Sequence, residues 1–112
     1  LHKSHKDYGF QEPIHYYTPS IATSEIIKIP NIFFKGNLEN NNENFFLSSL
    51  GYTDYEKEKS IYHIQFNNNL TELISENQIK IGERIRDLKY IKDIDKIILF
   101  LDNTASIAVI EK

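Results

Sequence analysis

The sequence has 112 residues, of which 40% are hydrophobic and 26% are charged, and its formal net charge is −3. A chain of this length can form one ordinary domain or part of a larger one, and it can bury roughly two-thirds of its unfolded surface. The acidic balance excludes a basic stripe for nucleic acid, the longest apolar runs fall short of the roughly 20 residues of a membrane span, and the lack of cysteine excludes disulfides and zinc–thiolate sites.

The start of the chain is irregular. Gly9, Pro13 and Pro19 interrupt any regular element, so residues 1–20 are predicted to be a lead-in segment without strands or helices. The sequence contains no methionine, begins at Leu1 and opens without the apolar core of a signal peptide. We therefore interpret the chain as a fragment of a longer protein.

Four strands are predicted after the lead-in segment. Isoleucine and the aromatic residues dominate here, and they favour a pleated, half-buried backbone. Apolar and polar residues alternate most clearly over residues 60–66, and proline, glycine or asparagine ends each run. The predicted strands are residues 21–29, 45–50, 60–66 and 70–75, and they assign residues 21–78 to one four-stranded blade.

The pattern after Asn77 fits two structures. Spacings of three and four are typical of an amphipathic helix, and a helix near residues 84–94 would make the chain an α+β domain. Gly82, the absence of a strong N-cap and the β-branched side chains favour strands at residues 84–91, 97–101 and 106–110 instead. We predict these three strands, within residues 79–112. The apolar positions that carry the helical spacing are Ile81, Ile85, Leu88, Ile91 and Ile94.

The seven strands predict an all-β fold. Short strands separated by turns at this spacing are typical of a sandwich, a barrel or a propeller. A group of four strands followed by a group of three is what one whole propeller blade and one incomplete blade would give.

Two arginines are the first candidates for a functional site. Arg84 and Arg86 are two residues apart, so on a strand both guanidinium groups project from one face. Two parallel forks suit an anion with several carboxylates or phosphates. Taken alone, the pair is explained more simply by a surface ion network with Glu83 and Asp87. Asp102, after a predicted strand, could form a turn, bind a cation or pair with an arginine.

The four histidines do not predict a metal site. His2 and His5 lie in the opening tail, His15 sits among tyrosines, and His63 is expected either to face solvent or to have a satisfied hydrogen bond. No pair of them has metal-ligand spacing, and no nucleophile motif is present. We therefore assign no catalytic residue and no metal ligand to this chain.

Three stretches narrow the interpretation. Residues 19–24 read PSIATS, residues 44–50 read NFFLSSL and residues 82–87 read GERIRD. In order and spacing they resemble the P-S-I-A-P-S segment, the following strand and the G-E-R-I-R-D motif of the glucose/sorbosone dehydrogenase family, and GERIRD is the most specific of the three. The similarity runs from about residue 9 to residue 112.

The resemblance implies a fold, a reaction and a site. The family consists of sugar dehydrogenases that use pyrroloquinoline quinone (PQQ) and are built as six-bladed β-propellers, and this chain would form about two blades at the C-terminal end. Hydride from an aldose would pass to PQQ, with calcium polarising the quinone. By position, the cofactor site would include Arg84, Arg86, Asp102, Leu50 and Ser20.

The same resemblance implies the partners of the chain. The histidine base and most calcium ligands would lie in earlier blades, so the partners would be a small sugar and the remaining blades of the parent protein. The fragment alone is expected to be inactive, and the family suggests a periplasmic or secreted location.

Two departures from the family support an alternative. Relatives often carry a lysine where this chain has Gly51, and an aromatic residue where it has Thr18. Loss of a cation and of a stacking ring would weaken quinone binding. The alternative is a propeller without cofactor that acts as a carbohydrate- or protein-binding module.

Overall fold

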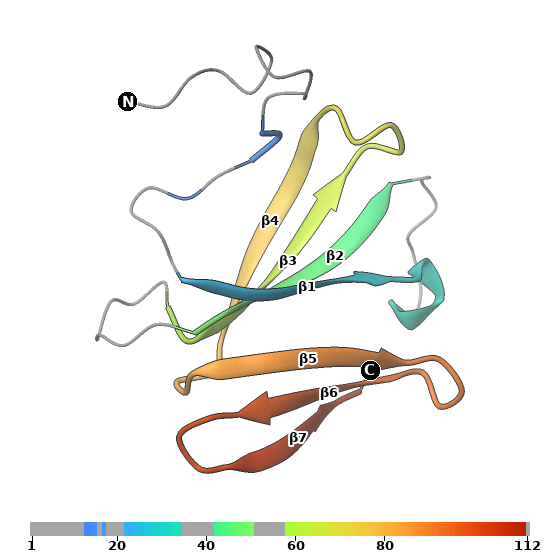
Figure 1. Ribbon diagram of the computed structural model, residues 1–112. Coiled ribbons are helices and arrows are strands. Elements are labelled where there is room, and N and C mark those ends of the chain that lie inside the picture. The colour runs from blue at the N-terminus through green and yellow to red at the C-terminus, as the bar shows by residue number, and fades with distance from the viewer. Residues whose placement is uncertain (1–12, 16, 18–21, 35–41, 51–57, 112) are drawn as a thin grey trace.

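The computed structural model describes residues 13–15, 17, 22–34, 42–50 and 58–111. Within these ranges the chain forms seven strands and one short 3₁₀ helix at Asn31–Phe33, and none of the described residues is in an α-helix (Figure 1). The strands are β1 (Thr23–Ile29), β2 (Glu43–Ser49), β3 (Ser60–Phe66), β4 (Leu73–Lys80), β5 (Ile85–Ile91), β6 (Lys96–Leu101) and β7 (Ser106–Ile110).

The strands form two antiparallel sheets. The first has the order β1-β2-β3-β4 and the second the order β5-β6-β7, so each strand pairs with its neighbour in sequence. Figure 1 shows the second sheet beside the first, with β5 running along β1. The prediction of an all-β fold with a group of four strands and a group of three is confirmed, and the arrangement is consistent with two propeller blades.

The alternative of a helix near residues 84–94 is wrong. Ile85–Ile91 is a strand, and the turn that follows it leads directly into β6. Gly82 adopts a φ of 86°, a left-handed conformation that glycine tolerates and that turns the chain before β5. The strand buries Ile85 and Leu88 against the other sheet, so tertiary packing decides against the helical spacing.

The fourth strand begins later than the sequence predicts. It spans Leu73–Lys80 rather than residues 70–75, because a longer turn precedes it. The Asn67 side-chain oxygen accepts hydrogen bonds from the backbone N–H groups of Thr71 and Glu72, at 2.8 and 3.1 Å. Leu70, inside this turn, has a φ of 56°. An asparagine that binds the backbone four and five residues ahead lengthens the turn at the expense of the strand.

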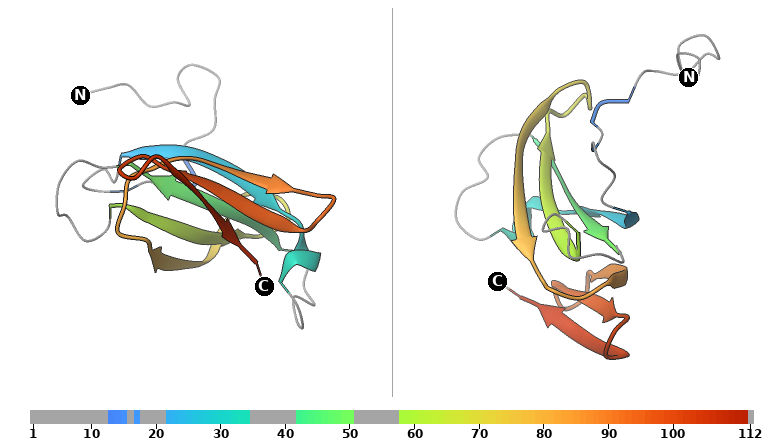
Figure 2. Two further views of the ribbon diagram at one scale, coloured as in Figure 1. Left: turned by 90° about the horizontal axis from the view of Figure 1, so that it is seen from below. Right: turned by 90° about the vertical axis from the view of Figure 1, so that its left-hand side faces the viewer.

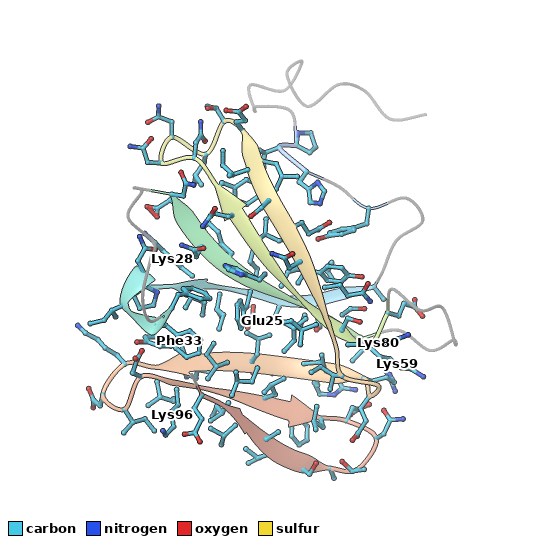
Figure 3. All side chains as sticks on the ribbon, turned by 180° about the vertical axis from the view of Figure 1, so that it is seen from behind. Glu25, Lys28, Phe33, Lys59, Lys80 and Lys96 are labelled. Atoms are coloured by element: carbon cyan, nitrogen blue, oxygen red, sulfur yellow. The ribbon has the colours of Figure 1, made fainter. Side chains whose placement is uncertain are left out.

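The main core lies between the two sheets. Strand β5 packs against β1 and β2. Phe33, from the 3₁₀ helix, is 1% exposed and lies between the ribbons of β1 and β5 in Figure 3. The buried members of this core are Ile29, Phe33, Phe46, Ile61, Ile85, Leu88, Ile97 and Leu99.

Both outer faces are also apolar. A second cluster covers the other side of the first sheet, where Tyr62, Ile64 and Phe66 are buried and Tyr17 packs against them. Figure 2 shows the described part of the lead-in segment passing along one side of this sheet. On the second sheet, Ile107 of β7 is 70% exposed. Each sheet therefore presents apolar side chains on two faces, whereas an isolated layer would have one polar face.

Candidate functional site

The predicted site residues that the structure describes, Leu50, Arg84, Arg86 and Asp102, lie at one end of the two sheets. There β2 ends, β1 and β5 begin, and β6 turns into β7, on the left of Figure 1. The Leu50 N–H donates to the Ala22 carbonyl at 2.7 Å, which ties the end of β2 to the start of β1. The N–H groups of Ile81 and Gly82 both donate to the Lys59 carbonyl, at 3.1 and 3.0 Å, which ties the segment before β5 to the start of β3.

The arginine pair stands at the start of β5. Arg84 and Arg86 are the only arginines in the sequence. Between them Ile85 is fully buried, while the side chains of Arg84 and Arg86 are 18% and 51% exposed. The register to β6 shifts between Ile85 and Asp87, so Arg86 occupies a β-bulge. A bulge bends the strand and re-aims a side chain, and here it leaves both arginines on the side opposite the core.

Asp102 binds both arginines. The Arg84 Nη1 lies 2.9 Å from Asp102 Oδ2, and the Arg86 Nε donates to Asp102 Oδ1 at 2.9 Å. The hydrogen bond from Arg86, followed by the charges of Arg86 and Arg84, outweighs burial and lowers the pKa of Asp102. The two guanidinium groups therefore converge on one ionised carboxylate. Of the three roles that the sequence leaves open for Asp102, the structure shows two: it begins the β6–β7 turn, the role that the sequence favours, and it is the partner of the arginines.

The acidic neighbours expected in a surface ion network have other contacts. The Glu83 carboxylate accepts hydrogen bonds from the N–H and the hydroxyl of Thr104, at 3.2 and 3.0 Å. The Asp87 carboxylate accepts from the N–H of Leu88 at 2.9 Å. The acidic partner that the structure shows for the two arginines is Asp102, which lies far from them in sequence.

Backbone contacts hold Asp102 in place. Its N–H donates to the Arg84 carbonyl at 2.8 Å, and the Arg84 N–H donates to the Asn103 side-chain oxygen at 3.2 Å. With the Glu83–Thr104 contacts, these bonds fasten the β6–β7 turn to the segment before β5. Sequence reasoning gave Glu83 another partner and missed Asn103 and Thr104, because one sequence carries no signal that pairs a turn with a segment about 20 residues earlier.

The other predicted residues are only partly described. Leu50 is half-buried at the same end of the sheets, next to the start of β1. Ser20, Thr18 and Gly51 lie outside the described residues. A role of Leu50 or Ser20 at a cofactor stays a prediction.

His63 has a satisfied hydrogen bond, one of the two outcomes expected for it. Its Nε2 lies 2.8 Å from the Asn44 side-chain oxygen, and its ring stacks on Phe34 with the centroids 4.5 Å apart. Asn44 is fully buried and also donates to Asn31 at 2.7 Å. His63 therefore belongs to a polar network inside the core.

His15 lies in a separate cluster on the outer face of the first sheet. One oxygen of Glu76 is 3.0 Å from His15 Nε2 and also accepts a hydrogen bond from the Tyr17 hydroxyl. Burial, and then the bond to Glu76, raises the pKa of Tyr17. Beside this cluster is a pocket of about 520 Å³, and its described lining is mainly apolar and includes none of Leu50, Arg84, Arg86 and Asp102.

We place the candidate site at the arginine pair and not at this pocket, because the arginine pair brings together charged groups that can bind an anion.

The described residues offer neither a metal cluster nor a helix that could span a membrane. They contain no group of three or more histidine, aspartate or glutamate side chains able to hold a metal ion. None of their helices has the length and apolar character needed to cross a membrane.

The comparisons with known proteins decide the family. The family model described as Glucose / Sorbosone dehydrogenase matches residues 1–109, nearly the whole chain. The chain belongs to the glucose/sorbosone dehydrogenase family. No curated protein and no solved structure matches it. Membership of the glucose/sorbosone dehydrogenase family makes this a sugar dehydrogenase-like chain, and its arginine pair lies in the stretch that most resembles the family.

Proposed function

We propose that the chain is part of a PQQ-dependent enzyme that oxidises an aldose, and that Arg84 and Arg86 bind carboxylates of the cofactor. Two observations support the proposal. The chain belongs to the glucose/sorbosone dehydrogenase family, and its only two arginines converge at one end of the sheets. The convergence on a single carboxylate is the observation that carries the assignment.

The chemistry of the donors suits such a cofactor. Asp102 demonstrates that a carboxylate fits against both guanidinium groups, with N–O distances of 2.9 Å on each side. A guanidinium presents its N–H donors as a planar fork that matches the two oxygens of a carboxylate. Asp102 contacts Arg84 through Nη1 and Arg86 through Nε. A carboxylate group is therefore the kind of ligand that this donor set suits.

The roles of the chain's own residues follow from this geometry. The chemistry that PQQ supplies when bound is acceptance of a hydride from the sugar. Arg84 and Arg86 would bind its carboxylates and stabilise negative charge that develops on its oxygens during the reaction. Asp102 would hold the two forks in register, and the base and the calcium ligands would come from other parts of the protein.

The apolar outer faces support a larger assembly. Ile26, Ile107 and Val109 are each at least half exposed on the sheets, with exposed fractions of 51%, 70% and 55%. Large contiguous apolar surfaces usually mark contacts with other protein. We propose that neighbouring propeller blades cover the outer faces of both sheets.

A titration with PQQ tests the assignment. The full-length parent protein, which contains this chain, is mixed with PQQ and calcium, and PQQ binding and dye reduction are measured with a panel of aldoses. The variants R84A and R86A each remove charge-assisted hydrogen bonds to a carboxylate, so each should weaken PQQ binding about tenfold to a hundredfold.

The matched control is K92A. Lys92 is an exposed cation in the β5–β6 turn, at the opposite end of β5. This variant should bind PQQ as the wild type does. If R84A and R86A bind PQQ no more weakly than K92A, the two arginines are not the cofactor site.

The second candidate function is a propeller that binds a carbohydrate or a protein without cofactor. One observation favours it: Asp102 already neutralises one of the two arginine charges. The same titration separates the two functions. A wild-type full-length parent that binds aldoses or a protein partner, and shows no PQQ-dependent dye reduction, would be a binding module.

A further inference from the structure

A pair of serines joins the three stretches that resemble the family. Ser24 closes the PSIATS stretch, Ser48 lies in NFFLSSL, and Ile85 lies in GERIRD. The hydroxyl oxygens of Ser24 and Ser48 are 2.8 Å apart, and the Ser24 hydroxyl donates to the Ile85 carbonyl at 2.6 Å. Segments that are up to 61 residues apart in sequence therefore meet through one hydroxyl group.

The direction of these bonds follows from the donors available. The Ile85 carbonyl can only accept, so the single proton of the Ser24 hydroxyl is directed to it. Ser48 must then be the donor in the serine pair. Ser48 is fully buried, and its other acceptor, the Glu25 carbonyl, is farther away at 3.3 Å. The hydrogen bonds thus run from Ser48 to Ser24 and from Ser24 to Ile85.

The Ile85 carbonyl belongs to the residue between the two arginines. Asp102 of the β6–β7 turn binds the Arg84 carbonyl, and successive carbonyls of an extended chain point to opposite sides. The Ile85 carbonyl therefore points away from β6 and toward β1, which belongs to the other sheet. Strand β5 is an edge of its sheet, so no ladder satisfies this group, and Ser24 supplies the donor.

We propose that Ser24 is a positioning residue for Arg84 and Arg86, and that Ser48 orients Ser24. Ser24 fixes the peptide group that links Ile85 to Arg86, at the bulge that aims Arg86. Asp102 holds the two guanidinium groups from the opposite side. Ser24 therefore holds the backbone between the two arginines, whereas Asp102 holds their side chains. The proposal rests on the function proposed above, in that the arginines are taken to bind the cofactor.

The first measurement is PQQ affinity of the full-length parent protein with calcium. The variant S24A leaves the Ile85 carbonyl without its donor, and it should weaken PQQ binding about fivefold to tenfold, the usual effect of one neutral hydrogen bond. S24T keeps the hydroxyl and should restore affinity to within about twofold of the wild type. The matched control is S75A: Ser75 is a half-buried strand serine on β4, away from this cluster, and its variant should bind as the wild type does.

The second measurement does not need the cofactor. Phenylglyoxal modifies arginine, and mass spectrometry of peptides gives separate rates for Arg84 and Arg86. In the wild type the more exposed Arg86 should react faster, since its side chain is 51% exposed against 18% for Arg84. In S24A the Arg84 rate should rise and the two rates should converge, whereas S24T and S75A should keep the wild-type ratio.

The outcomes separate the two proposals. Wild-type protein that does not bind PQQ overturns the proposed function, and the labelling rates then still decide whether Ser24 positions the arginines. If S24A changes neither PQQ affinity nor the ratio of labelling rates, Ser24 has no positioning role. If S24A fails to fold, S48A is used in its place, because it keeps the Ser24 hydroxyl but removes the Ser48 hydroxyl that orients it. S48A should shift the ratio of the Arg84 and Arg86 labelling rates in the same direction by a smaller amount. An unchanged ratio in S48A overturns the proposal.

Discussion

Asp102 is the residue on which the arginine pair depends. Two cations beside one carboxylate stabilise its ionised form, and this lowers the pKa of Asp102 in the folded protein below its ordinary value of 3.8. A lowered pKa means that the ionised group stabilises the fold at pH values above its unfolded pKa. That stabilisation is lost as the pH falls through the folded pKa.

Acid should therefore remove the contribution of Asp102. We expect the free energy of unfolding of the wild type to exceed that of D102N at neutral pH, and the difference to shrink below about pH 4. Urea unfolding of the full chain at a series of pH values measures this difference. The control is E111Q, which removes an exposed ion pair to Lys96 (2.6 Å) at a distant position. A D102N difference that stays constant between neutral and acidic pH would contradict the proposed linkage.

Tyr17, on the outer face of the first sheet, should make stability depend on pH at the alkaline end. Burial, and then the hydrogen bond to Glu76, raises its pKa above the ordinary value of 10.0, so its neutral form stabilises the fold and this contribution is lost as the pH rises through the raised pKa. Tyrosine ionisation is followed by the absorbance of tyrosinate as the pH is raised. In Y17F, the tyrosine that ionises at the highest pH should be missing from this titration. In E76Q, Tyr17 should ionise at lower pH than in the wild type, because the negative charge of Glu76 no longer raises the pKa of Tyr17. Equal titrations of the wild type and E76Q would exclude this contact.

For single residues, spacing in the sequence predicts which side chains share a face, but it does not predict which partners they contact. The period of two in a strand predicts that Arg84 and Arg86 project from the same face of the sheet, and both do contact Asp102, although Arg86 occupies a bulge. It could not identify Asp102 as their shared partner, because that pairing depends on the register between β5 and β6. The contacts of Ser24 and Glu83 depend on the same register and on the packing of one sheet against the other.

Among the elements, the 3₁₀ helix connects the two sheets. Phe33 is 1% exposed and makes ring contacts with Phe46 of β2 and Tyr90 of β5, with centroids 6.3 and 6.2 Å apart. Its ring therefore contributes to the core on both sides. The neighbouring Ile32 in the same helix is 76% exposed and has no such role.

Removing the Phe33 ring should be costly. We expect F33A to lower the free energy of unfolding by about 3–5 kcal/mol, because the substitution loses buried apolar surface and leaves a cavity between the sheets. The matched variant I32A should stay within about 0.5 kcal/mol of the wild type. Urea unfolding of the full chain measures both, and similar values for the two variants would show that Phe33 does not connect the sheets.

The elements also show where the sequence is sufficient. The strands predicted at residues 60–66 and 106–110 coincide with β3 and β7, because alternation and flanking turn residues agree there. The helical spacing after residue 77 misleads, since Ile85 and Leu88 are three apart only because the bulge adds a residue between them. A bulge shifts the strand period toward that of a helix, so the spacing alone does not distinguish the two, and the preference for strands comes from Gly82 and the β-branched residues.

For the whole molecule, the apolar outer faces matter most. Phe100 and Ile107 face each other across β6 and β7, with exposed fractions of 38% and 70%, and they line a shallow pocket of about 240 Å³ with Ile98. Asp87 and Lys89 also line this pocket, but the other residues of its lining are apolar, and exposed apolar patches usually mark contacts with other protein. We expect this face to be covered in the full protein, as the proposed neighbouring blades require.

A lysine on that face tests the expectation. If a neighbouring blade covers Ile107, the variant I107K buries an unpaired charge and should lower the free energy of unfolding of the full protein by about 1–3 kcal/mol or more. The control is I94K: Ile94 is 56% exposed, but it lies in the β5–β6 turn, where a lysine can reach solvent and should change stability by less than about 0.5 kcal/mol. The same substitution of isoleucine by lysine should therefore lower the free energy of unfolding much more at Ile107 than at Ile94. Equal melting temperatures for I107K and I94K would mean that the outer face of the second sheet stays open to water, which a closed propeller does not allow.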